Sequence, residues 1–237
     1  MSNPYTHLAQ YYDFFADPES EVQIIRKIKE YITDFSQASL LDLGCGTGRL
    51  TGEFAPFFSQ VYGLDNSFEM LEIFKERQGS IADSKIDLRL ADISTDKLPQ
   101  ADVVIALTDV LNHLSPAKLP LACKNIEQAF KEHTLFIFDL LKLDYLREER
   151  GDFTFYSELG NEEMPSTCFV WENSWDEELW EARSQFTFFH EEGGLYRRNL
   201  AELTEYYYEV EELFSYFKEL SLLDSLDLPE RKLFIAR

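Results

Sequence analysis

Leu40 to Gly48 read Leu-Leu-Asp-Leu-Gly-Cys-Gly-Thr-Gly, an apolar run that passes directly into a loop with glycine at every second position. Further along the chain, a second short apolar run, Val61 to Leu64, ends on Asp65. Alternating glycines let a backbone turn tightly and approach a ligand where a β-carbon would collide. An acid at the end of a neighbouring strand is placed to accept hydrogen bonds from ribose hydroxyls. Together the loop and the acid indicate a site for a cofactor that contains adenosine.

The spacing of the glycines distinguishes among such cofactors. Nicotinamide cofactors favour the order GxGxxG, and Arg49 occupies the position of the third glycine. Gly48 instead comes one residue early and Asp42 lies two residues before Gly44, which gives Asp-x-Gly-x-Gly-x-Gly. Two alternatives stay open on these residues alone: an oxidoreductase that binds NAD or a flavin, and a strand-to-helix turn whose glycines serve packing.

The charge of the chain argues against polyanionic partners. The 237 residues are enough for a substantial core, and 22 Lys and Arg stand against 44 Asp and Glu, a formal charge of −22. This charge repels phosphate backbones and anionic lipid surfaces, so we expect neither nucleic acid nor a membrane as partner. The short basic pairs are expected to be solvated surface groups: Arg147 with Arg150, Arg197 with Arg198, and Arg231 with Lys232.

Hydropathy and cysteine usage indicate a cytoplasmic protein. No apolar run approaches the roughly 20 residues that a membrane span requires, and no secretory signal is visible near Met1. Cys45, Cys123 and Cys168 are scattered, and neither they nor the four histidines show the spacing of a metal site. We therefore expect a reducing compartment and no bound metal.

Apolar periodicity predicts alternating strands and helices over the first part of the chain. Nearly continuous apolar strands separated by helices indicate a parallel sheet that is covered on both faces. We expect strands at 40–43, 61–64, 86–90, 101–107 and 135–139. We expect helices at 19–35, at 49–58, after a cap at Asn66 or Ser67, and at 116–131.

The pattern changes between Phe153 and Tyr208, where aromatic residues crowd short segments with period-two alternation. Antiparallel hairpins are expected there, with turns at 174–178 and 191–194 between strands near 168–173, 180–190 and 196–204. One face of the middle strand carries Trp180, Ala182, Ser184, Phe186, Phe188 and His190. This face needs a cover, which the ligand mouth of the parallel sheet, a second subunit or the neighbouring strands would supply.

These patterns predict an α/β fold with a Rossmann-like, seven-stranded, mostly parallel sheet, helices on both faces, and a small antiparallel β cap. Helical spacing at 210–217 precedes two final strands at 220–226 and 232–236. We expect the core to comprise residues 1–145 and 207–237 and the inserted cap to comprise residues 146–206.

The motifs together resemble those of class I S-adenosylmethionine (SAM) dependent methyltransferases. The Asp-x-Gly-x-Gly-x-Gly loop, Asp65-Asn66-Ser67 and Ala91-Asp92-Ile93 follow one another as in that family. The aromatic cap is similar to that of YqeM-type and sugar N-methyltransferases. The resemblance implies SAM as cofactor and methyl transfer to a nitrogen or oxygen of a small molecule.

The resemblance also implies which residues bind the cofactor. The loop with Gly44, Gly46 and Gly48 would run beneath the methionine part of SAM, and Asp65 would hold the ribose hydroxyls. Asp92 would accept a hydrogen bond from the adenine amino group. The remaining expected contacts are Asp42 and Cys45 in the loop, Asn66 and Met70 after Asp65, Ile93 and Leu107 beside the adenine, and Tyr5 and Tyr12 as an aromatic lid.

The loop after the fourth expected strand carries the candidate catalytic residues, because open parallel sheets place chemistry beyond the carboxyl ends of their strands. His113 is the best general base by its ordinary pKa, and Asp109 or Asn112 would orient it or the substrate. From the cap, Trp171 and Arg198 are expected to bind the substrate.

Absent motifs favour a small-molecule acceptor. The fourth expected strand lacks the Asn/Asp-Pro-Pro-Tyr of many enzymes that methylate bases and protein amides, and the Pro-Cys of pyrimidine carbon methyltransferases is also missing. A protein that binds SAM or a partner without turnover stays an alternative, as does an NAD-dependent oxidoreductase. The aromatic cap also allows a homodimer.

Overall fold

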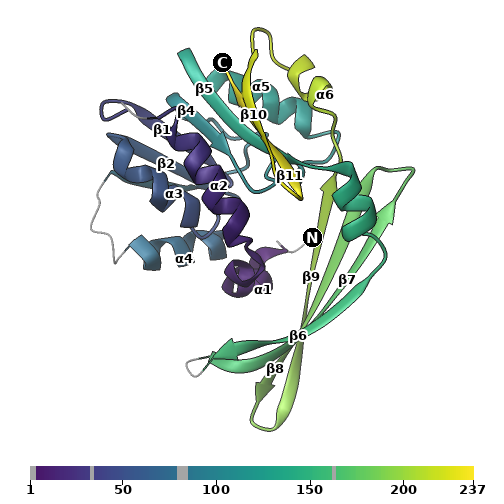
Figure 1. The fold of residues 1–237 in the computed structure, drawn as a ribbon. Coiled ribbons are helices and arrows are strands. Elements are labelled where there is room, and N and C mark those ends of the chain that lie inside the picture. Colours follow the sequence, from purple (N-terminus) through teal and green to yellow (C-terminus); the bar gives the residue numbers. More distant parts are fainter. Residues whose placement is uncertain (1–3, 33–34, 79–84, 162–163) are drawn as a thin grey trace.

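The computed structural model describes residues 4–32, 35–78, 85–161 and 164–237, which form two separate β-sheets (Figure 1). The larger sheet has seven strands in the order β10-β11-β5-β4-β1-β2-β3. The smaller sheet has four strands in the order β6-β7-β8-β9. The fold class predicted from the sequence is therefore confirmed.

The larger sheet is parallel from β3 to β5, and β11 joins it antiparallel to β5. The chain runs outward from β1 to β3 and then returns to place β4 on the other side of β1. Loops that leave β1 and β4 therefore diverge, which opens a crevice at the carboxyl ends of these strands. The strands are β1 (Ser39–Leu43), β2 (Gln60–Asp65), β3 (Ile86–Leu90), β4 (Ala101–Ala106), β5 (Phe130–Leu141), β10 (Leu222–Asp227) and β11 (Arg231–Ala236).

Helices cover both faces of this sheet because successive strand residues point to opposite sides. Leu40 packs in one core with α2 (Pro18–Lys29) and α3 (Arg49–Phe54), whereas Leu41 packs in another with α5 (Leu119–Ala129). α6 (Val210–Ser215) joins the α5 side, and α4 (Phe68–Gln78) lies beside β3.

Helix boundaries differ from the expected ones mainly at their ends. α2 ends at Lys29 rather than at Phe35, and α5 begins at Leu119 rather than at Pro116. Ile32 is still buried in the same core as α2, so the apolar spacing continued beyond the helix itself. Residues 33 and 34 of the expected helix lie outside the described residues.

The smaller sheet, the cap sheet, consists of four antiparallel strands that extend away from the core (Figure 1). Ala182, Ser184, Phe186 and Phe188 are buried on one face of the middle strand, as the alternation predicted. The strands are β6 (Thr154–Asn161), β7 (Met164–Asp176), β8 (Glu181–Glu192) and β9 (Leu195–Tyr206).

The cover of this face is the N-terminal segment, which the sequence did not reveal. This segment consists of α1 (Tyr5–Leu8) and a 3₁₀ helix (Ala9–Phe15). Tyr11 stacks on Phe188 with ring centroids 5.1 Å apart, and Phe15 meets Phe186 edge to face at 5.5 Å. The N-terminal segment thus forms one hydrophobic cluster with the cap sheet.

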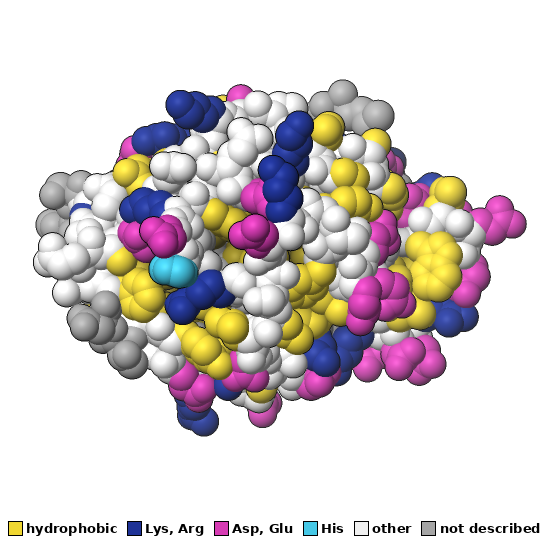
Figure 2. Space-filling model, turned by 90° about the horizontal axis from the view of Figure 1, so that it is seen from above, with side chains coloured by type: hydrophobic (Ala, Val, Ile, Leu, Met, Phe, Trp, Pro, Cys, Tyr) yellow, Lys and Arg dark blue, Asp and Glu magenta, His cyan; other side chains and the backbone are white. Residues whose placement is uncertain are grey.

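Charged and apolar side chains are interspersed on the surface. On the face shown in Figure 2, Lys and Arg side chains lie in separate groups among acidic and apolar ones. None of the described helices is both long and apolar enough to cross a membrane.

Phe188→Ala should destabilise the protein far more than Phe189→Ala. Phe188 is fully buried under the N-terminal segment, so we expect its removal to lower the free energy of unfolding by about 3–5 kcal/mol. Phe189 lies on the opposite face of β8 and is partly exposed, so we expect a loss of only about 1 kcal/mol. Urea unfolding followed by circular dichroism measures both values, and equal losses would contradict the assignment of faces.

Candidate active site

Two adjoining cavities lie at the carboxyl ends of the parallel strands. The first, the loop cavity, has a volume of about 140 Å³ and is lined by Gly44, Gly46, Asp65, Asn66, Asp92 and Ile93 among others. The second, the cap cavity, has a volume of about 130 Å³, and its lining includes Arg150, Trp171, Phe186, Leu203, Glu205 and Arg231. Four residues line both cavities and form a shared wall: Tyr5, Tyr12, Thr108 and His113.

Glycine is required at the three positions of the loop for different structural reasons. All three have positive φ angles, +67° at Gly44, +52° at Gly46 and +78° at Gly48. A β-carbon at Gly44 would lie 2.5 Å from Val110, and one at Gly48 would lie 2.2 Å from Phe74, so protein packing requires these two glycines. A β-carbon at Gly46 would meet no atom within 4 Å. Gly46 is therefore the glycine whose open side faces space for a ligand.

Asp65 lies at the loop cavity, as predicted. Its carboxylate accepts hydrogen bonds from the backbone N–H groups of Gly46 and Ser67, both at 2.8 Å. Burial raises the pKa of Asp65 despite these hydrogen bonds, which favour the charged form. Asn66 and Met70 line the same cavity. The end of β2 thus presents a fixed carboxylate beside the glycine loop.

Asp92 and Ile93 line the far part of the loop cavity. Lys118 Nζ lies 2.8 Å from Asp92 Oδ2, and Ser94 donates two hydrogen bonds to Asp92 Oδ1. Burial opposes ionisation of Asp92, but these partners outweigh it and lower its pKa. Lys118 also lines the cavity, and no sequence pattern had singled it out.

Four of the expected cofactor residues lie outside the lining of the loop cavity, namely Asp42, Cys45, Gly48 and Leu107. Gly48 packs against Phe74, whereas the other three line a smaller hollow of about 30 Å³ that also borders the glycine loop. Asp42 accepts a 2.5 Å hydrogen bond from Thr51 Oγ1, and burial raises its pKa to about 7. Asp42 thereby joins β1 to the first turns of α3, and Val110 takes the place expected for Leu107.

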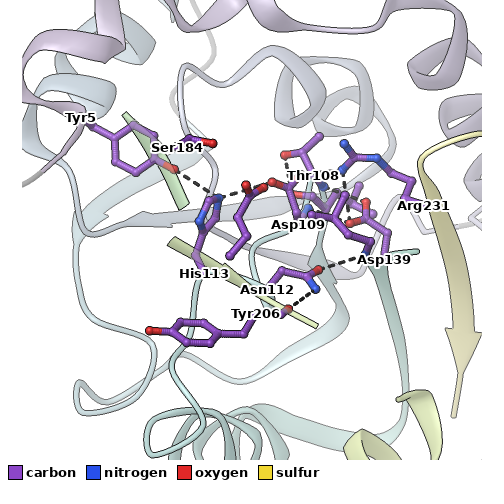
Figure 3. A network of polar contacts seen from close by, with 12 residues as sticks. Tyr5, Thr108, Asp109, Asn112, His113, Asp139, Ser184, Tyr206 and Arg231 are labelled. Atoms are coloured by element: carbon purple, nitrogen blue, oxygen red, sulfur yellow. Dashed lines mark hydrogen bonds and ion pairs between the residues drawn. The ribbon is translucent and has the colours of Figure 1, made fainter. Parts of the chain in front are cut away.

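The loop after β4 has a strained backbone that one buried carboxylate stabilises. Thr108 and Asp109 both have a φ of 60°, which is rare for residues with a β-carbon. Asp139, with 0% exposure, accepts hydrogen bonds from both of their N–H groups at 2.7 Å (Figure 3). The two oxygens of Asp139 thus fix Thr108, which belongs to the shared wall, and Asp109, which lines the cap cavity.

Arg231 is a buried part of this network, so its expected position on the surface is wrong. Its side chain is 11% exposed, and Nη1 lies 2.7 Å from Asp109 Oδ1 and 3.5 Å from Asp139 Oδ1 (Figure 3). The antiparallel pairing of β11 with β5 places Arg231 opposite Leu141, at the strand ends. Although burial opposes ionisation of Asp109, Arg231 and His113 hold its pKa well below the usual range.

Arg150 is likewise buried rather than solvated. Its side chain is 12% exposed, and its guanidinium donates to both carboxylate oxygens of Glu205, at 3.2 Å and 2.5 Å. Ser184 accepts a further hydrogen bond from Arg150 at 2.7 Å. Burial raises the pKa of Glu205, and Arg150 counteracts this effect only in part. The sequence did not indicate Glu205, which comes from the last strand of the cap sheet.

His113 lies in the shared wall, next to groups from three parts of the chain. Its Nε2 is 3.4 Å from Asp109 Oδ2 and 3.4 Å from the hydroxyl of Tyr5 (Figure 3). Burial lowers the pKa of His113, but the hydrogen bond and charge of Asp109 outweigh it, and the net shift is upward. The structure thus places His113 and Asp109 together at the cavities, as the sequence predicted.

Asp109, His113 and Glu205 bring their ligating atoms within 4.8 Å of one another, close enough to hold a metal ion. Both carboxylates already have a cationic partner, since Asp109 pairs with Arg231 and Glu205 pairs with Arg150. This charge compensation favours a cluster that handles protons and polar ligands over one that binds a metal.

Asn112 has a structural role, in place of the expected role of orienting His113 or the substrate. Its Nδ2 donates to the carbonyl of Tyr206 at 2.8 Å, and its Oδ1 accepts from the N–H of Leu141 at 3.1 Å (Figure 3). The side chain is fully buried and lines neither the loop cavity nor the cap cavity. Asn112 therefore connects the cap sheet to β5 and to the loop that carries His113.

Of the two predicted substrate residues from the cap, the structure brings one to the site. Trp171 lines the cap cavity, whereas Arg198 is exposed and lines neither the cap cavity nor the loop cavity. Arg198 pairs with Phe189, on the face of the cap sheet opposite to Phe186. Period-two alternation excludes Arg198 from the cavity.

Comparison with known proteins supports the family resemblance. Residues 40–133 match a family described as "Methyltransferase domain". A (S)-coclaurine N-methyltransferase from Thalictrum flavum subsp. glaucum is 31% identical over 121 residues, which are 50% of this chain and 33% of that protein. The chain thus spans about a third of the length of this curated relative.

Solved structures match over nearly the whole chain. A SAM-dependent methyltransferase from Clostridium acetobutylicum ATCC 824 has a TM-score of 0.80 at 25% identity and covers 99% of both chains. A SAM-bound amino pentose methyltransferase from Micromonospora echinaspora has a TM-score of 0.71 at 20% identity, with 100% of this chain and 98% of that chain covered. The resemblance to class I SAM-dependent methyltransferases is confirmed.

Asp109→Asn should lower the pKa of His113. Asp109 supplies the hydrogen bond and the negative charge that do most to raise this pKa against the effect of burial, and after their loss only the smaller effects of the Glu205 charge and the Thr204 backbone hydrogen bond oppose burial. Titration of the His113 imidazole by NMR should give a midpoint above that of an ordinary histidine in the wild type and a lower midpoint in the variant. The matched variant Asp87→Asn removes a carboxylate that pairs with Arg89 and should leave the midpoint unchanged. An equal or higher midpoint in Asp109→Asn would show that Asp109 does not control His113.

Proposed function

Since residues 40–133 match a methyltransferase domain, we propose that this chain transfers a methyl group from SAM to a nitrogen or oxygen of a small molecule. The observation that carries the proposal is the pair of cavities that meet at one shared wall. One cavity has the features of a nucleoside site, and the other is lined by aromatic and charged side chains. Methyl transfer needs this arrangement, because cofactor and acceptor must meet end to end with water excluded.

The residues of the loop cavity fit SAM. The open side of Gly46 leaves room for the cofactor, and Asp65 and Asn66 at the end of β2 would hold the ribose. Asp92 and Ile93 would bind the adenine, the first by its carboxylate and the second by apolar contact. When bound, SAM supplies a methyl group attached to a positively charged sulfur. A nucleophile in line with the methyl–sulfur bond takes the methyl group, and the sulfur is the leaving group.

The shared wall would align the acceptor and exclude water. Tyr5 and Tyr12 pack edge to face with ring centroids 6.0 Å apart, and both line the two cavities. Burial raises the pKa of both tyrosines, so their hydroxyls stay neutral. Thr108, fixed by Asp139, completes the wall from the other side. The N-terminal segment thus belongs to the site as well as to the cap.

His113 would take the proton that the acceptor releases. An acceptor that arrives as an ammonium or a hydroxyl must lose a proton, and a neutral His113 accepts it at Nε2. Asp109 stabilises the resulting imidazolium, since it lies 3.4 Å away and stays ionised. Glu205 adds a second carboxylate on the cap side.

The charge of the cap cavity favours an amine as acceptor. Its lining contains five carboxylates and three guanidinium groups. The carboxylates belong to Asp17, Glu21, Asp109, Glu205 and Glu230 and the guanidinium groups to Arg49, Arg150 and Arg231. An excess of negative charge in a partly buried cavity attracts an ammonium group. One similar protein is named as an amino pentose methyltransferase and another as an N-methyltransferase, and both names are consistent with this substrate class.

The alternatives have less support. An NAD-dependent oxidoreductase would need a glycine where Arg49 stands. A protein that binds SAM without turnover would not need His113 and Asp109 beside the shared wall.

Four other features remain predictions. The domain division at residues 145 and 207 agrees with the position of the cap sheet between β5 and α6. A homodimer through the cap would cover the outward side chains of Tyr156 and Leu195, which are 81% and 75% exposed. The free thiols of Cys45, Cys123 and Cys168 fit a cytoplasmic location. The overall acidity still disfavours nucleic acid as substrate.

Gly46→Arg should abolish SAM binding while the protein stays folded. The new side chain would occupy the loop cavity, where no protein atom lies within 4 Å of a β-carbon, and we expect affinity to fall by about 100-fold or more. Gly193→Arg is the matched control, because this glycine also has a positive φ, +61°, and its β-carbon also meets nothing within 4 Å, but it lies in the turn between β8 and β9, outside both cavities. Calorimetry with SAM, S-adenosylhomocysteine and NAD measures the effect. Undiminished SAM binding by Gly46→Arg, or competition by NAD, would contradict the proposal.

Turnover is tested by supplying SAM and a metabolite extract to the wild-type protein. The proposal predicts that S-adenosylhomocysteine accumulates and that a methylated small molecule appears in the extract. SAM binding without S-adenosylhomocysteine across broad extracts would favour the non-catalytic alternative.

A further inference from the structure

Three buried donors on side chains that line the cap cavity have no hydrogen-bond partner among the described residues. One is Nε of Arg49, which lies 3.7 Å from Asp13 Oδ1 in an ion pair. The other two are Nε1 of Trp171 and Nε of Arg150. The two groups are neighbours, since the guanidinium carbon of Arg150 lies 5.1 Å from the centre of the Trp171 ring. Buried donors in folded proteins are nearly always paired, so two unpaired donors at one cavity indicate a ligand that accepts hydrogen bonds.

Neither side chain can turn away to find another partner. Trp171 stacks on Phe186 with ring centroids 5.1 Å apart and meets Phe15 edge to face at 5.7 Å. The terminal nitrogens of Arg150 are occupied by Glu205 and Ser184. Packing and hydrogen bonds therefore fix both donors before a ligand arrives, and preorganised donors of this kind discriminate between ligands.

Charge identifies the kind of oxygen that fits these donors. Glu205 already compensates the charge of Arg150, and its two oxygens are both bound to that guanidinium. The remaining lining is acidic overall, so an anionic oxygen would be repelled. An uncharged hydroxyl or ether oxygen can accept a hydrogen bond from either donor without this penalty.

We propose that Trp171 and Arg150 form a subsite that selects methyl acceptors bearing an uncharged hydroxyl or ether oxygen. This inference rests on the proposed function of the cap cavity as the acceptor site. The nitrogen would then lie toward His113 and Asp109 at the shared wall, and the oxygen toward the cap sheet. The acceptor class is accordingly a small hydroxylated or ether-containing amine.

The test compares two probes on the protein saturated with S-adenosylhomocysteine. The probes are trans-2-aminocyclohexanol and cyclohexylamine, which share the amine and ring and differ in one hydroxyl. Calorimetry should show that the wild type binds the aminoalcohol about tenfold more tightly. In Trp171→Phe, which keeps an aromatic ring but lacks the N–H group, this preference should fall by about fivefold.

Trp175→Phe is the matched control. Trp175 also lies on β7, but its Nε1 donates to Glu177 at 2.6 Å and its side chain does not line the cap cavity. This variant should keep the wild-type preference. Equal affinity for the two probes in the wild type, an unchanged preference in Trp171→Phe, or no binding of the aminoalcohol at millimolar concentration would overturn the subsite.

The failure of this inference differs from a failure of the proposed function. A protein that binds S-adenosylhomocysteine but does not distinguish the probes contradicts only the oxygen subsite. A protein that does not bind S-adenosylhomocysteine contradicts the proposed function itself.

Discussion

The buried carboxylate of Asp139 holds together the part of the structure on which the site depends. It accepts hydrogen bonds from the N–H groups of Thr108 and Asp109, two consecutive residues in the left-handed conformation. Both Asp139 and Asp109 also form an ion pair with Arg231. Without this anchor, the left-handed conformation of Thr108 and Asp109 would cost free energy, on the order of 1–3 kcal/mol each. The loop in turn positions His113 in the wall between the two cavities. A residue at the end of β5 thus controls geometry at the end of β4.

The N-terminal segment links the cap sheet to the same wall. Tyr11 and Phe15 pack on the cap sheet, whereas Tyr5 and Tyr12 line both cavities. The same short segment therefore packs against the cap sheet with some of its residues and lines the site with others. Any displacement of the segment would uncover the apolar face of β8 and open the wall, so the stability of the cap and the closure of the site are connected.

The sequence predicted the features that depend on local pattern. Alternating glycines, apolar strands and the acid at Asp65 are each read from a few neighbouring residues, and the parallel sheet and the cap sheet followed from them. Groups joined by long-range pairing were not predictable. Arg231 and Arg150 resemble surface residues in the sequence, and Glu205 is one acid among many, because only the pairing of distant strands brings them together. Arg198 shows the opposite error, because it was predicted to bind the substrate but is exposed. Neighbouring residues along a strand point to opposite faces of the sheet, so an error of one position places a side chain on the wrong face.

In the proposed function, the cavity beside Gly46 holds the nucleoside and the cavity under the cap holds the acceptor. A crystal structure of the protein grown with S-adenosylhomocysteine tests this claim. The nucleoside is expected against Gly46, with its ribose at Asp65, its base at Asp92 and its sulfur directed toward Tyr5 and His113. A nucleoside bound beneath the cap sheet, or a structure in which Asp65 and Asp92 make no contact with it, would contradict the claim.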